Sequence, residues 1–545
     1  MDSGRRPTSK PRYFLFLAAG LLSASLFPGT IAAAVFNCPP GDVSCLIAAI
    51  NAANANPDPD TINLEAGTYT LSTPAGGGPF EPNGLPVISS PITIQGAGAG
   101  ATIVQRDAAL DLQVPVLTFR VLQVSLSGTL TLDSLSVRNG HTEEGSGGGI
   151  LNFGTLTIVD TDVMRNGTEL GSGGGISNAG TLHLSGSLVA NNGASTAGGI
   201  SNDGTMTIDR SSIRDNGAEN IGGIRNTGTA TITNSAVTNN QGSFFGGGIA
   251  NEGGTLTLTS TTVALNRGGF EVGFGGGIGN DGGGTVHINN STIADNSIPD
   301  NGGAGIENDS GTVELQNSIL ARNAMSFPLI PFPPGPDCVG VITSLGHNLI
   351  EDPSDCSISL LGTDRTGNPG LGFFKDDGTP GNGHIPLIVG SQSIDGGDPA
   401  SCTPTDQLGR VRADGDGNGE VVCDMGAVEF ANEEPIVSNL VSLTTLSTLP
   451  FEPDPTGGLT IRASFVNTSP TPIHAPVFVV TELSNGNLLS NSDDPSGAVD
   501  SILTPDVGSD RVLSPGESFD VEFNILFAEK KPFTFFVDLL GSEGP

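Results

Sequence analysis

The stretch GGISNAGTLHLSGSLVANNGASTAGGISNDGTM, residues 174–206, holds the same motif twice, with its isoleucines at Ile176 and Ile200. Seven copies of this motif occur along the chain, and each has a glycine before an isoleucine and an asparagine two residues after it. The asparagines of these copies are Asn152, Asn178, Asn202, Asn226, Asn251, Asn280 and Asn308. A second asparagine column follows in the same repeats, at Asn166, Asn192, Asn216, Asn240, Asn266, Asn296 and Asn323. Two columns in step identify the centre of the chain as a repeat array.

Each repeat holds three short apolar runs in which apolar and polar residues alternate. A period of two is typical of strands with one buried face, and one repeat cannot bury that face alone, so neighbouring repeats must stack. The pattern predicts an all-β chain built around a right-handed parallel β-helix with three short strands per coil. Equal asparagines would then lie about 4.8 Å apart and form a hydrogen-bonded ladder. We expect these asparagines at turns, in the left-handed conformation.

The array divides the chain into five expected segments. The first has a basic start, a short apolar core at 14–27 and three alanines at 32–34, which is typical of a cleaved export signal. An Ala-rich stretch at 44–56 predicts a helix, with Ser44 as its N-cap, that covers the open edge of the first coil. Alternating apolar segments after residue 435 predict a sandwich. The segments are 1–34 as a signal peptide, 35–90 as an N-terminal cap, 91–330 as the β-helix repeats, 331–432 as the end of the β-helix, and 433–545 as a small immunoglobulin-like β-sandwich.

The charge and the cysteines limit the partners and the compartment. The formal charge is −36, and such an acidic surface repels nucleic acid, so nucleic acid is not an expected partner. After residue 34 no apolar run is long enough to predict a transmembrane segment. Export permits disulfides, and the cysteines fall into three close pairs. We expect the local pairing Cys38–Cys45, Cys338–Cys356 and Cys402–Cys423.

Three acids, Glu252, Asp281 and Asp309, each follow a first-column asparagine on consecutive repeats. In stacked coils their carboxylates would lie about 5 Å apart. Carboxylates at that separation can hydrolyse glycosides or hold Ca²⁺. A polar turn position that tolerates acids explains the same pattern more simply. We therefore expect no catalytic residue here and keep these three as weak catalytic candidates.

A second acidic cluster follows the array and predicts an optional Ca²⁺ site. Its order, Asp-Gly-Asp-Gly-Asn-Gly-Glu at 414–420, supplies oxygen ligands at alternate positions around a glycine turn. Met425 stands where an EF-hand has its bidentate acid, so the stretch is not an EF-hand. The alternative is an ordinary acidic turn between two disulfide-bonded cysteines. The candidate ligands are Asp414, Asp416, Asn418, Glu420 and Asp424, and no cofactor is expected to be required.

Several blocks resemble known families. SCLIAAINAAN (44–54) followed by PDTINLEAGTYTL (59–71) resembles the N-terminal segment of CSLREA-type β-helix proteins, with Ile47-Ala48 where that name has Arg-Glu. GHNLIEDPSDC (346–356), GSQSIDGGDPASC (390–402), DQLGRVRADGDGNG (406–419) and CDMGAVE (423–429) resemble the choice-of-anchor Q domain. The repeats are similar to pectate-lyase-like and polymorphic outer-membrane-protein β-helices. The resemblance implies an exported bacterial protein with a pectin-lyase-like β-helix.

Two functions are compatible with these features. The first, which we prefer, is a non-catalytic, exported β-helix protein, secreted or at the cell surface. It would be an adhesin-like or carbohydrate-binding scaffold whose partners are extracellular glycans or cell-surface components. The alternative is a polysaccharide lyase or glycoside hydrolase. A lyase needs a base beside its acids; Arg214 and Arg225, near Asp203 and Asp215, are the best candidates, although arginine is a poor base. The sequence therefore favours a scaffold over an enzyme.

Overall fold

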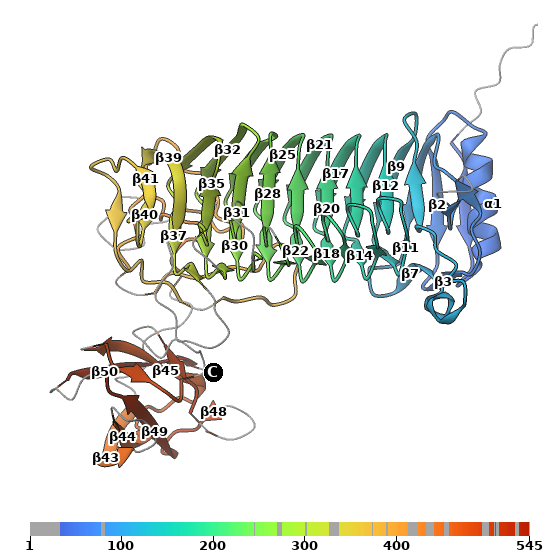
Figure 1. Cartoon of the computed structure of the whole chain (residues 1–545). Coiled ribbons are helices and arrows are strands. Elements are labelled where there is room, and N and C mark those ends of the chain that lie inside the picture. The colour runs from blue at the N-terminus through green and yellow to red at the C-terminus, as the bar shows by residue number, and fades with distance from the viewer. Residues whose placement is uncertain are drawn as a thin grey trace, which may run out of the picture.

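Figure 1 shows the chain as an elongated stack of coils, with a separate β-domain formed by the C-terminal residues. The computed structural model describes residues 33–77, 82–244, 246–269, 275–299, 302–325, 337–372, 374–388, 391–412, 422–431, 441–451, 457–484, 486–492, 501–505, 507, 512–528 and 533–543. The predicted signal peptide, apart from its last two residues, lies outside these ranges. The all-β class and the parallel β-solenoid, of about 11 turns, are confirmed.

One coil shows how the repeat folds. It contains β12 (Ile150–Asn152), β13 (Thr155–Val159), β14 (Asp162–Met164) and β15 (Gly167–Thr168). The coil thus has four strand segments, whereas the sequence predicted three. The fourth, β15, consists of Gly and Thr, so the hydrophobic pattern could not reveal it. Because β12 and β13 belong to the same sheet, three sheets run along the array, with 21, 12 and five strands.

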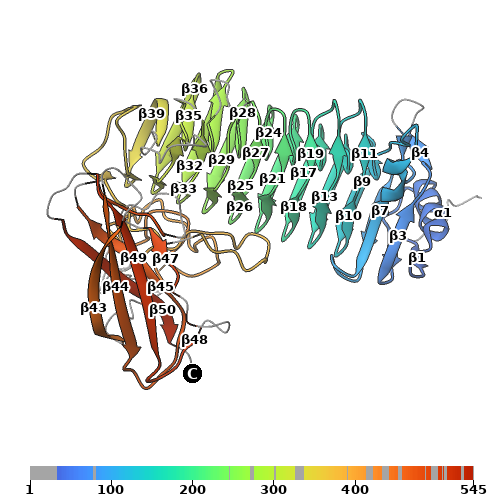
Figure 2. The same ribbon diagram turned by 60° about the horizontal axis from the view of Figure 1, so that its bottom comes forward.

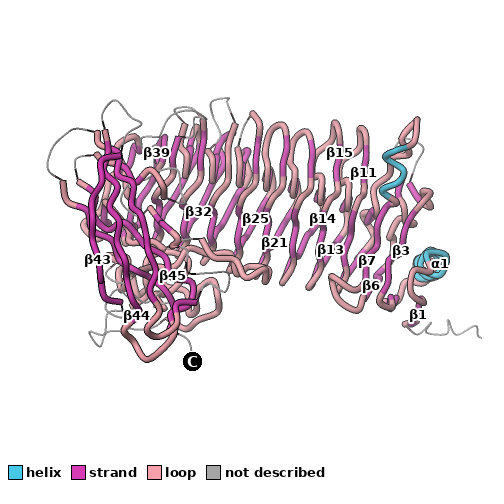
Figure 3. The backbone as a smooth tube through the Cα atoms, turned by 90° about the horizontal axis from the view of Figure 1, so that it is seen from below, coloured by secondary structure: helices cyan, strands magenta, loops and turns pink. Residues whose placement is uncertain are grey.

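The aliphatic residues of each repeat line up from coil to coil. Ile150 pairs with Ile176 in the parallel register, Leu156 pairs with Leu182, and Val163 pairs with Val189. These side chains are fully buried in one continuous core that runs the length of the array. Burial of these side chains stabilises the fold by about 25 cal/mol for every Å² of apolar surface that is removed from water. Figure 3 shows the strands as successive rungs of this stack.

The first asparagine column forms a buried ladder. The side-chain amide of Asn178 donates to Oδ1 of Asn202 at 2.7 Å, and Asn202 donates to Oδ1 of Asn226 at 2.7 Å. The same bond joins every neighbouring pair from Asn152 to Asn308. A second ladder joins Asn166 to Asn323 in the same way. The expected single file of asparagines is therefore present twice.

The ladder asparagines do not have the left-handed backbone that the sequence suggested. Positive φ angles occur instead at the residue just before each second-column asparagine: Arg165, Asn191, Asp215, Asn239, Leu265, Asp295 and Arg322. The ladder asparagine needs its side chain inside the coil, where the amide stabilises the turn by accepting from backbone N–H groups, as Asn192 Oδ1 does from the N–H of Asn166 at 2.9 Å. The preceding residue makes the turn and projects its side chain outward.

The parallel sheets extend beyond the predicted limits of 91 and 330. At the N-terminal end, β1 (Val35–Cys38) pairs with β2 (Asp60–Leu64), which pairs with β6 (Pro91–Gln95). At the other end, β40 (Leu349–Ile350) pairs with β42 (Arg365–Thr366). The segment 35–90 therefore carries stacked strands in addition to a helix.

The helix α1 covers Val43–Asn54 and contacts β1, β2, β6 and β3 (Gly67–Leu71). Its apolar side buries Leu46, Ala49, Ile50 and Ala53. The predicted N-cap was Ser44, but the N-cap is Asp42, whose carboxylate accepts from the N–H of Cys45 at 2.9 Å. Ser44 Oγ donates to the same carboxylate at 2.6 Å, so Ser44 supports the cap from inside the first turn.

The described residues between 371 and 431, which we call the return segment, fold back along the array. Gly381 donates its N–H to Ser212 Oγ, and Thr262 Oγ1 donates to Gln407 Oε1. The N–H of Gly426 donates to the carbonyl of Asn317. The segment buries an apolar outer surface of the 12-stranded sheet made by Ala264, Ala294, Ile319, Ala321 and Leu349, against Leu371, Ile385, Leu387 and Met425. Figure 2 shows this segment along the lower edge of the coils.

The C-terminal domain consists of two antiparallel sheets. The first contains β43 (Val441–Phe451), β44 (Gly458–Asn467), β49 (Ser518–Leu526) and β46 (Leu488–Leu489), in that order. The second contains β47 (Ile502–Leu503), β45 (Ile473–Leu483), β48 (Val512–Leu513) and β50 (Phe535–Glu543). Phe478, Phe519 and Phe523 pack together in their shared core.

The ladder predicts the cost of removing one rung. Asn202→Ala removes the donor to Oδ1 of Asn226 and one of the acceptors of the Asn178 amide, which keeps its bonds to the carbonyls of Gly180 and Thr205. Each unsatisfied buried group costs about 1–3 kcal/mol, so we expect a clear fall in melting temperature and faster amide exchange in the coils on either side. Asn51→Ala, at an exposed position of α1, is the control and should change little. A ladder that did not stabilise the coils would give equal effects for the two variants.

Candidate functional site

A polar groove follows the turn columns along the outside of the array. A cavity of about 450 Å³ spans three coils, marked by Asn139, Arg165 and Asn191. A second, of about 590 Å³, begins on the next coil and spans four, marked by Asp215, Asn239, Leu265 and Asp295. Adjacent coils are about 4.8 Å apart, so seven coils give a path about 29 Å long. We call this surface the glycine groove, for the residues of its floor.

The floor is formed by the five-stranded sheet, whose strands are β11 (His141–Thr142), β15, β19 (Gly193–Ala194), β23 (Gly217–Ala218) and β27 (Gln241–Gly242). A Cβ atom added to Gly167, Gly193 or Gly217 would lie 3.5, 3.9 or 4.0 Å from its nearest neighbour. These are ordinary contacts, and none of the three has a positive φ. Packing therefore does not require glycine at these three positions. Because glycine has no side chain, the floor of the groove stays open.

Glycines elsewhere in the same coil are required by packing. A Cβ at Gly175 would lie 2.8 Å from the carbonyl oxygen of Gly199 and 2.9 Å from the ladder amide of Asn192. Neither atom has room to move, because both belong to the stacked core. The contrast with Gly193 separates two uses of glycine: one allows close approach inside the coil, and the other clears the groove.

A cluster of titratable groups lies at the N-terminal end of the groove. The Nδ1 atom of His141 is 3.5 Å from a carboxylate oxygen of Asp111, and its Nε2 atom is 3.3 Å from a carboxylate oxygen of Glu169. All three line the first cavity. An imidazole held between two carboxylates is suited to proton transfer. This is the one place along the groove where the described residues bring a histidine between two acids.

Arg106 holds one side of this cluster in place. Its side chain is fully buried, donates to Asp111 at 2.7 Å, and donates twice to the carbonyl of Leu117. The guanidinium also lies over the ring of Phe119, 5.5 Å from its centre. Asp111 belongs to the short 3₁₀ helix Ala108–Leu112, so the buried arginine fixes the loop that closes this end of the groove.

The predicted acidic column has a structural explanation. Glu252 and Asp281 are register partners on adjacent strands. Glu252, however, accepts from Arg225 at 2.7 Å, and Asp281 accepts from Ser310 at 2.9 Å. The backbone N–H of Asp309 donates to the carbonyl of Asn280, so this residue takes part in the backbone pairing of adjacent coils. Among the described residues no group of three or more His, Cys, Asp or Glu could hold a metal ion.

The arginines considered as lyase bases are both paired with acids. Arg225 bridges Asp203 at 3.2 Å and Glu252 at 2.7 Å, across neighbouring coils. Arg214 lies 2.5 Å from Asp215. Because both guanidinium groups are engaged by carboxylates of the protein itself, neither is arranged to accept a proton from a substrate.

Of the predicted Ca²⁺ ligands, Asp414, Asp416, Asn418 and Glu420 lie outside the described residues. Asp424 is described and fully buried, and its two oxygens accept from the N–H groups of Asp395 and Phe430. The neighbouring Glu429 accepts from Arg412 at 2.5 Å. Asp424 therefore holds the return segment together, and its carboxylate is already occupied by backbone donors.

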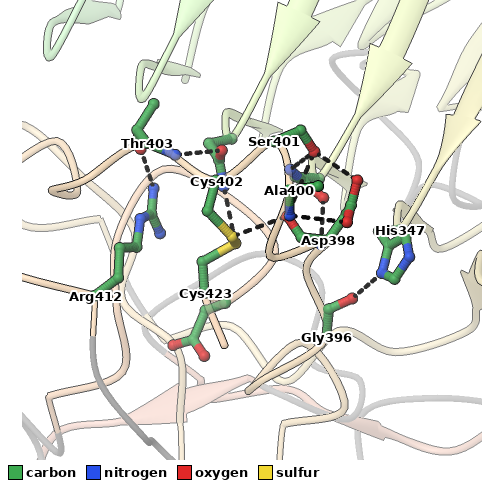
Figure 4. The surroundings of a disulfide bond; sticks show 12 residues. His347, Gly396, Asp398, Ala400, Ser401, Cys402, Thr403, Arg412 and Cys423 are labelled. Atoms are coloured by element: carbon green, nitrogen blue, oxygen red, sulfur yellow. Dashed lines mark hydrogen bonds between the residues drawn. A yellow bond between two sulfur atoms is a disulfide. The ribbon is translucent and has the colours of Figure 1, made fainter. Parts of the chain in front are cut away.

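The three predicted disulfides are confirmed: Cys38–Cys45, Cys338–Cys356 and Cys402–Cys423. The third closes the return segment beside the array, and Figure 4 shows its surroundings. There Arg412 donates to Thr403 Oγ1 at 3.0 Å, and the imidazole of His347 lies 2.9 Å from the carbonyl of Gly396. The disulfide and these bonds fix the return segment at one point on the coils.

Sequence reasoning missed the cluster around His141. One signal was available: His141 aligns with Gly167 on the next coil, so Glu169 lies two positions further along that coil. The register of the repeats could therefore have placed the histidine near the glutamate. Asp111 could not be found in this way, because it comes from a loop outside the repeat pattern.

The fold and the groove define a class: a parallel β-solenoid with a long polar groove on its surface. Comparison with protein-family models, with curated proteins and with solved structures gives no match. Within the described residues, no helix combines the length and apolar character needed to cross a membrane.

Two buried acids predict how stability depends on pH. Burial raises the pKa of Asp337 from its ordinary value of 3.8 to about 7, against hydrogen bonds from the N–H of Asp352 and from Asn323. Burial, with the negative charge of Glu429, raises the pKa of Asp424 to about 7 as well. Between pH of about 4 and 7 the folded protein therefore binds protons that the unfolded chain has lost, so the free energy of unfolding falls as pH rises.

Melting temperatures measured over this range should therefore decrease toward neutral pH. Asp337→Asn removes one titrating group and keeps an oxygen facing Asn323, so its curve should be flatter than that of the unaltered protein. Asp424→Asn should flatten the curve in the same way. Curves that run parallel for all three proteins would contradict the assignment of these two acids.

Proposed function

We propose that this chain is an exported, non-catalytic scaffold, secreted or held at the cell surface, that binds extracellular glycans along the glycine groove. The observation that carries the proposal is that two cavities follow the same turn column over seven successive coils. A compact ligand needs a single pocket, whereas a path of this length fits an extended polymer. The repeat supplies one similar binding position per coil.

The chemistry of the lining favours uncharged sugars. Apart from Ala108, Leu265 and the glycines, the lining residues carry amide, hydroxyl, imidazole or charged groups. Amides such as Asn191, Asn239 and Gln241 can both donate to and accept from sugar hydroxyls. The charge of −36 opposes acidic polymers. No aromatic ring lines either cavity apart from His141, so affinity must come from many hydrogen bonds, and longer chains should bind more tightly than short ones.

Finer features of the fold belong to the same proposal. We infer that the solenoid is right-handed, because parallel crossovers almost always are, that α1 caps its first coil, and that the C-terminal sheets form an immunoglobulin-like sandwich. The resemblance of 44–71 to CSLREA-type proteins and of 346–429 to the choice-of-anchor Q domain supports export. In this view residues 331–432, which include the return segment, are the choice-of-anchor Q-like end of the β-helix.

A polysaccharide lyase or glycoside hydrolase is the second candidate, and one observation favours it. His141, between Asp111 and Glu169, lies in the groove where a bound polymer would end or pass. If this cluster catalyses cleavage, Glu169→Gln abolishes turnover and leaves binding intact. If the chain is a scaffold, no turnover is detected with the unaltered protein.

The test is to block the floor of the groove. Gly193→Tyr places a ring where a Cβ has its nearest neighbour at 3.9 Å, so the coil should tolerate it while the groove is closed. We expect at least about a tenfold loss of affinity for the neutral oligosaccharide that binds best in a glycan screen, which corresponds to about 1.4 kcal/mol. Binding is measured by calorimetry, with and without Ca²⁺.

The matched control is Gly362→Tyr, at an exposed glycine with nothing within 4 Å of an added Cβ and outside the groove. It should bind like the unaltered protein. Melting temperatures of both variants show whether the fold is preserved. If Gly193→Tyr is folded and binds glycans normally, the groove is not the binding surface.

A further inference from the structure

Two long strands of the C-terminal domain, β43 and β50, each pair with one neighbour among the described residues, β44 and β45. The other edge of β43 therefore presents free backbone N–H and C=O groups, and β43 differs from β50 in carrying no charged residue, whereas β50 contains Asp538 and Glu543. Figure 2 shows β43 on the outer edge of its sheet. Seven of its residues, 442–444 and 446–449, are exposed. Three of them are leucines, Leu443, Leu446 and Leu449, exposed by 51, 61 and 43%.

This strand lacks the charged side chains that commonly protect exposed edges. Its sequence, VSLTTLSTLPF at 441–451, has no charged residue, although the chain carries 57 acids and 21 bases. Natural edge strands are commonly guarded by charged side chains, bulges or proline. Here a bulge lies between Leu443 and Thr445, inside the strand, and a proline stands at position 450 near its end. From Thr445 to Leu449 the strand is regular and uncharged, and residues 446–449 are exposed.

The sequence of the strand is nearly palindromic about Leu446. Reading outward from it, Thr445 matches Ser447, Thr444 matches Thr448, and Leu443 matches Leu449. In an antiparallel pair, residues directly opposite each other are the ones that interact. A second copy of β43, related by a two-fold axis through Leu446, would therefore place leucine opposite leucine and hydroxyl opposite hydroxyl at every position.

We propose that β43 pairs with β43 of a second copy of this chain, joining two C-terminal domains edge to edge in a symmetric dimer. The pairing is centred on Leu446 and runs from Leu443 to Leu449, so it includes the bulge at Thr444 of each strand. A two-fold axis requires a self-complementary surface, and the palindrome supplies one. This inference does not rest on glycan binding by the groove.

The negative charge of the chain favours contact between copies at uncharged surfaces. Two chains of charge −36 repel each other over most of their surfaces, and the uncharged edge of β43 is where this repulsion is least. A seven-residue pairing is small compared with stable interfaces, so we expect a weak, concentration-dependent dimer. Added salt screens the repulsion and should strengthen it.

Sedimentation velocity of the purified full chain tests the proposal. We expect the mean mass to rise from monomer toward dimer as the protein concentration and then the NaCl concentration are raised. Leu446→Lys puts two like charges on the axis and should leave a monomer under all these conditions. Mixing Leu446→Lys with Leu446→Glu places opposite charges there and should restore the dimer. Leu170→Lys, at a leucine of the array exposed by 70%, is the control and should dimerise normally.

Cysteine cross-linking tests the register independently. Leu446→Cys should link to itself under mild oxidation, because the axis passes through this residue. Leu443→Cys should link to Leu449→Cys in a mixture but not to itself. The proposal is overturned if the chain is monomeric at every concentration and salt level, if Leu446→Lys leaves a dimer intact, or if Leu446→Cys gives no cross-link while folded.

Discussion

The structure depends on a buried side-chain amide that donates to its own copy one coil away. An aliphatic core alone specifies register weakly, since one isoleucine stacks on a leucine nearly as well as on another isoleucine. The amide of Asn202 is different, because it is fully buried and donates to Asn226 while accepting from Asn178. A slip by one residue would leave these groups unpaired, at about 1–3 kcal/mol each. The ladder therefore fixes which residues of neighbouring coils lie opposite each other.

The number of residues between the two asparagine columns varies more on one side of the coil than on the other, and the groove lies on the more variable side. From a first-column to the next second-column asparagine the chain always takes 14 to 16 residues, whereas the return to the following first column takes 10 to 14. The less variable part carries the five-residue strands, such as β13, and the strands that follow them, such as β14. The variable part begins at the left-handed turn, crosses the glycine floor and supplies the loops beside it. Variation in length is thus tolerated next to the groove, where loops can change without disturbing the stack.

The sequence predicted what repetition controls and missed what it does not. The parallel stack, the ladders and the three disulfides followed from residues in step, such as Ile176 with Ile200, or from cysteines close in sequence. The fourth strand was missed because Gly167-Thr168 has no hydrophobic signal. The left-handed turn was assigned to the ladder asparagines because asparagine tolerates that conformation, whereas the residues that adopt it include Arg165 and Leu265. The return segment could not be foreseen, since Gly381 and Ser212 meet across 169 residues. The cluster at His141 needed both the register and a loop outside it.

The hydrogen bonding and apolar packing that build the array also determine which of its surfaces must be covered. A stack of parallel strands exposes apolar surface wherever the pattern is interrupted. The return segment covers one such place, at Ala294 and Ile319 on the 12-stranded sheet, and Leu46 and Ile50 of α1 belong to the same buried core as the strands of the array. Elsewhere, acids on a surface of charge −36 discourage contact between copies. The edge of β43 has neither an intramolecular cover nor charge, so among the described strands its free backbone is the place where pairing with another chain meets the least resistance.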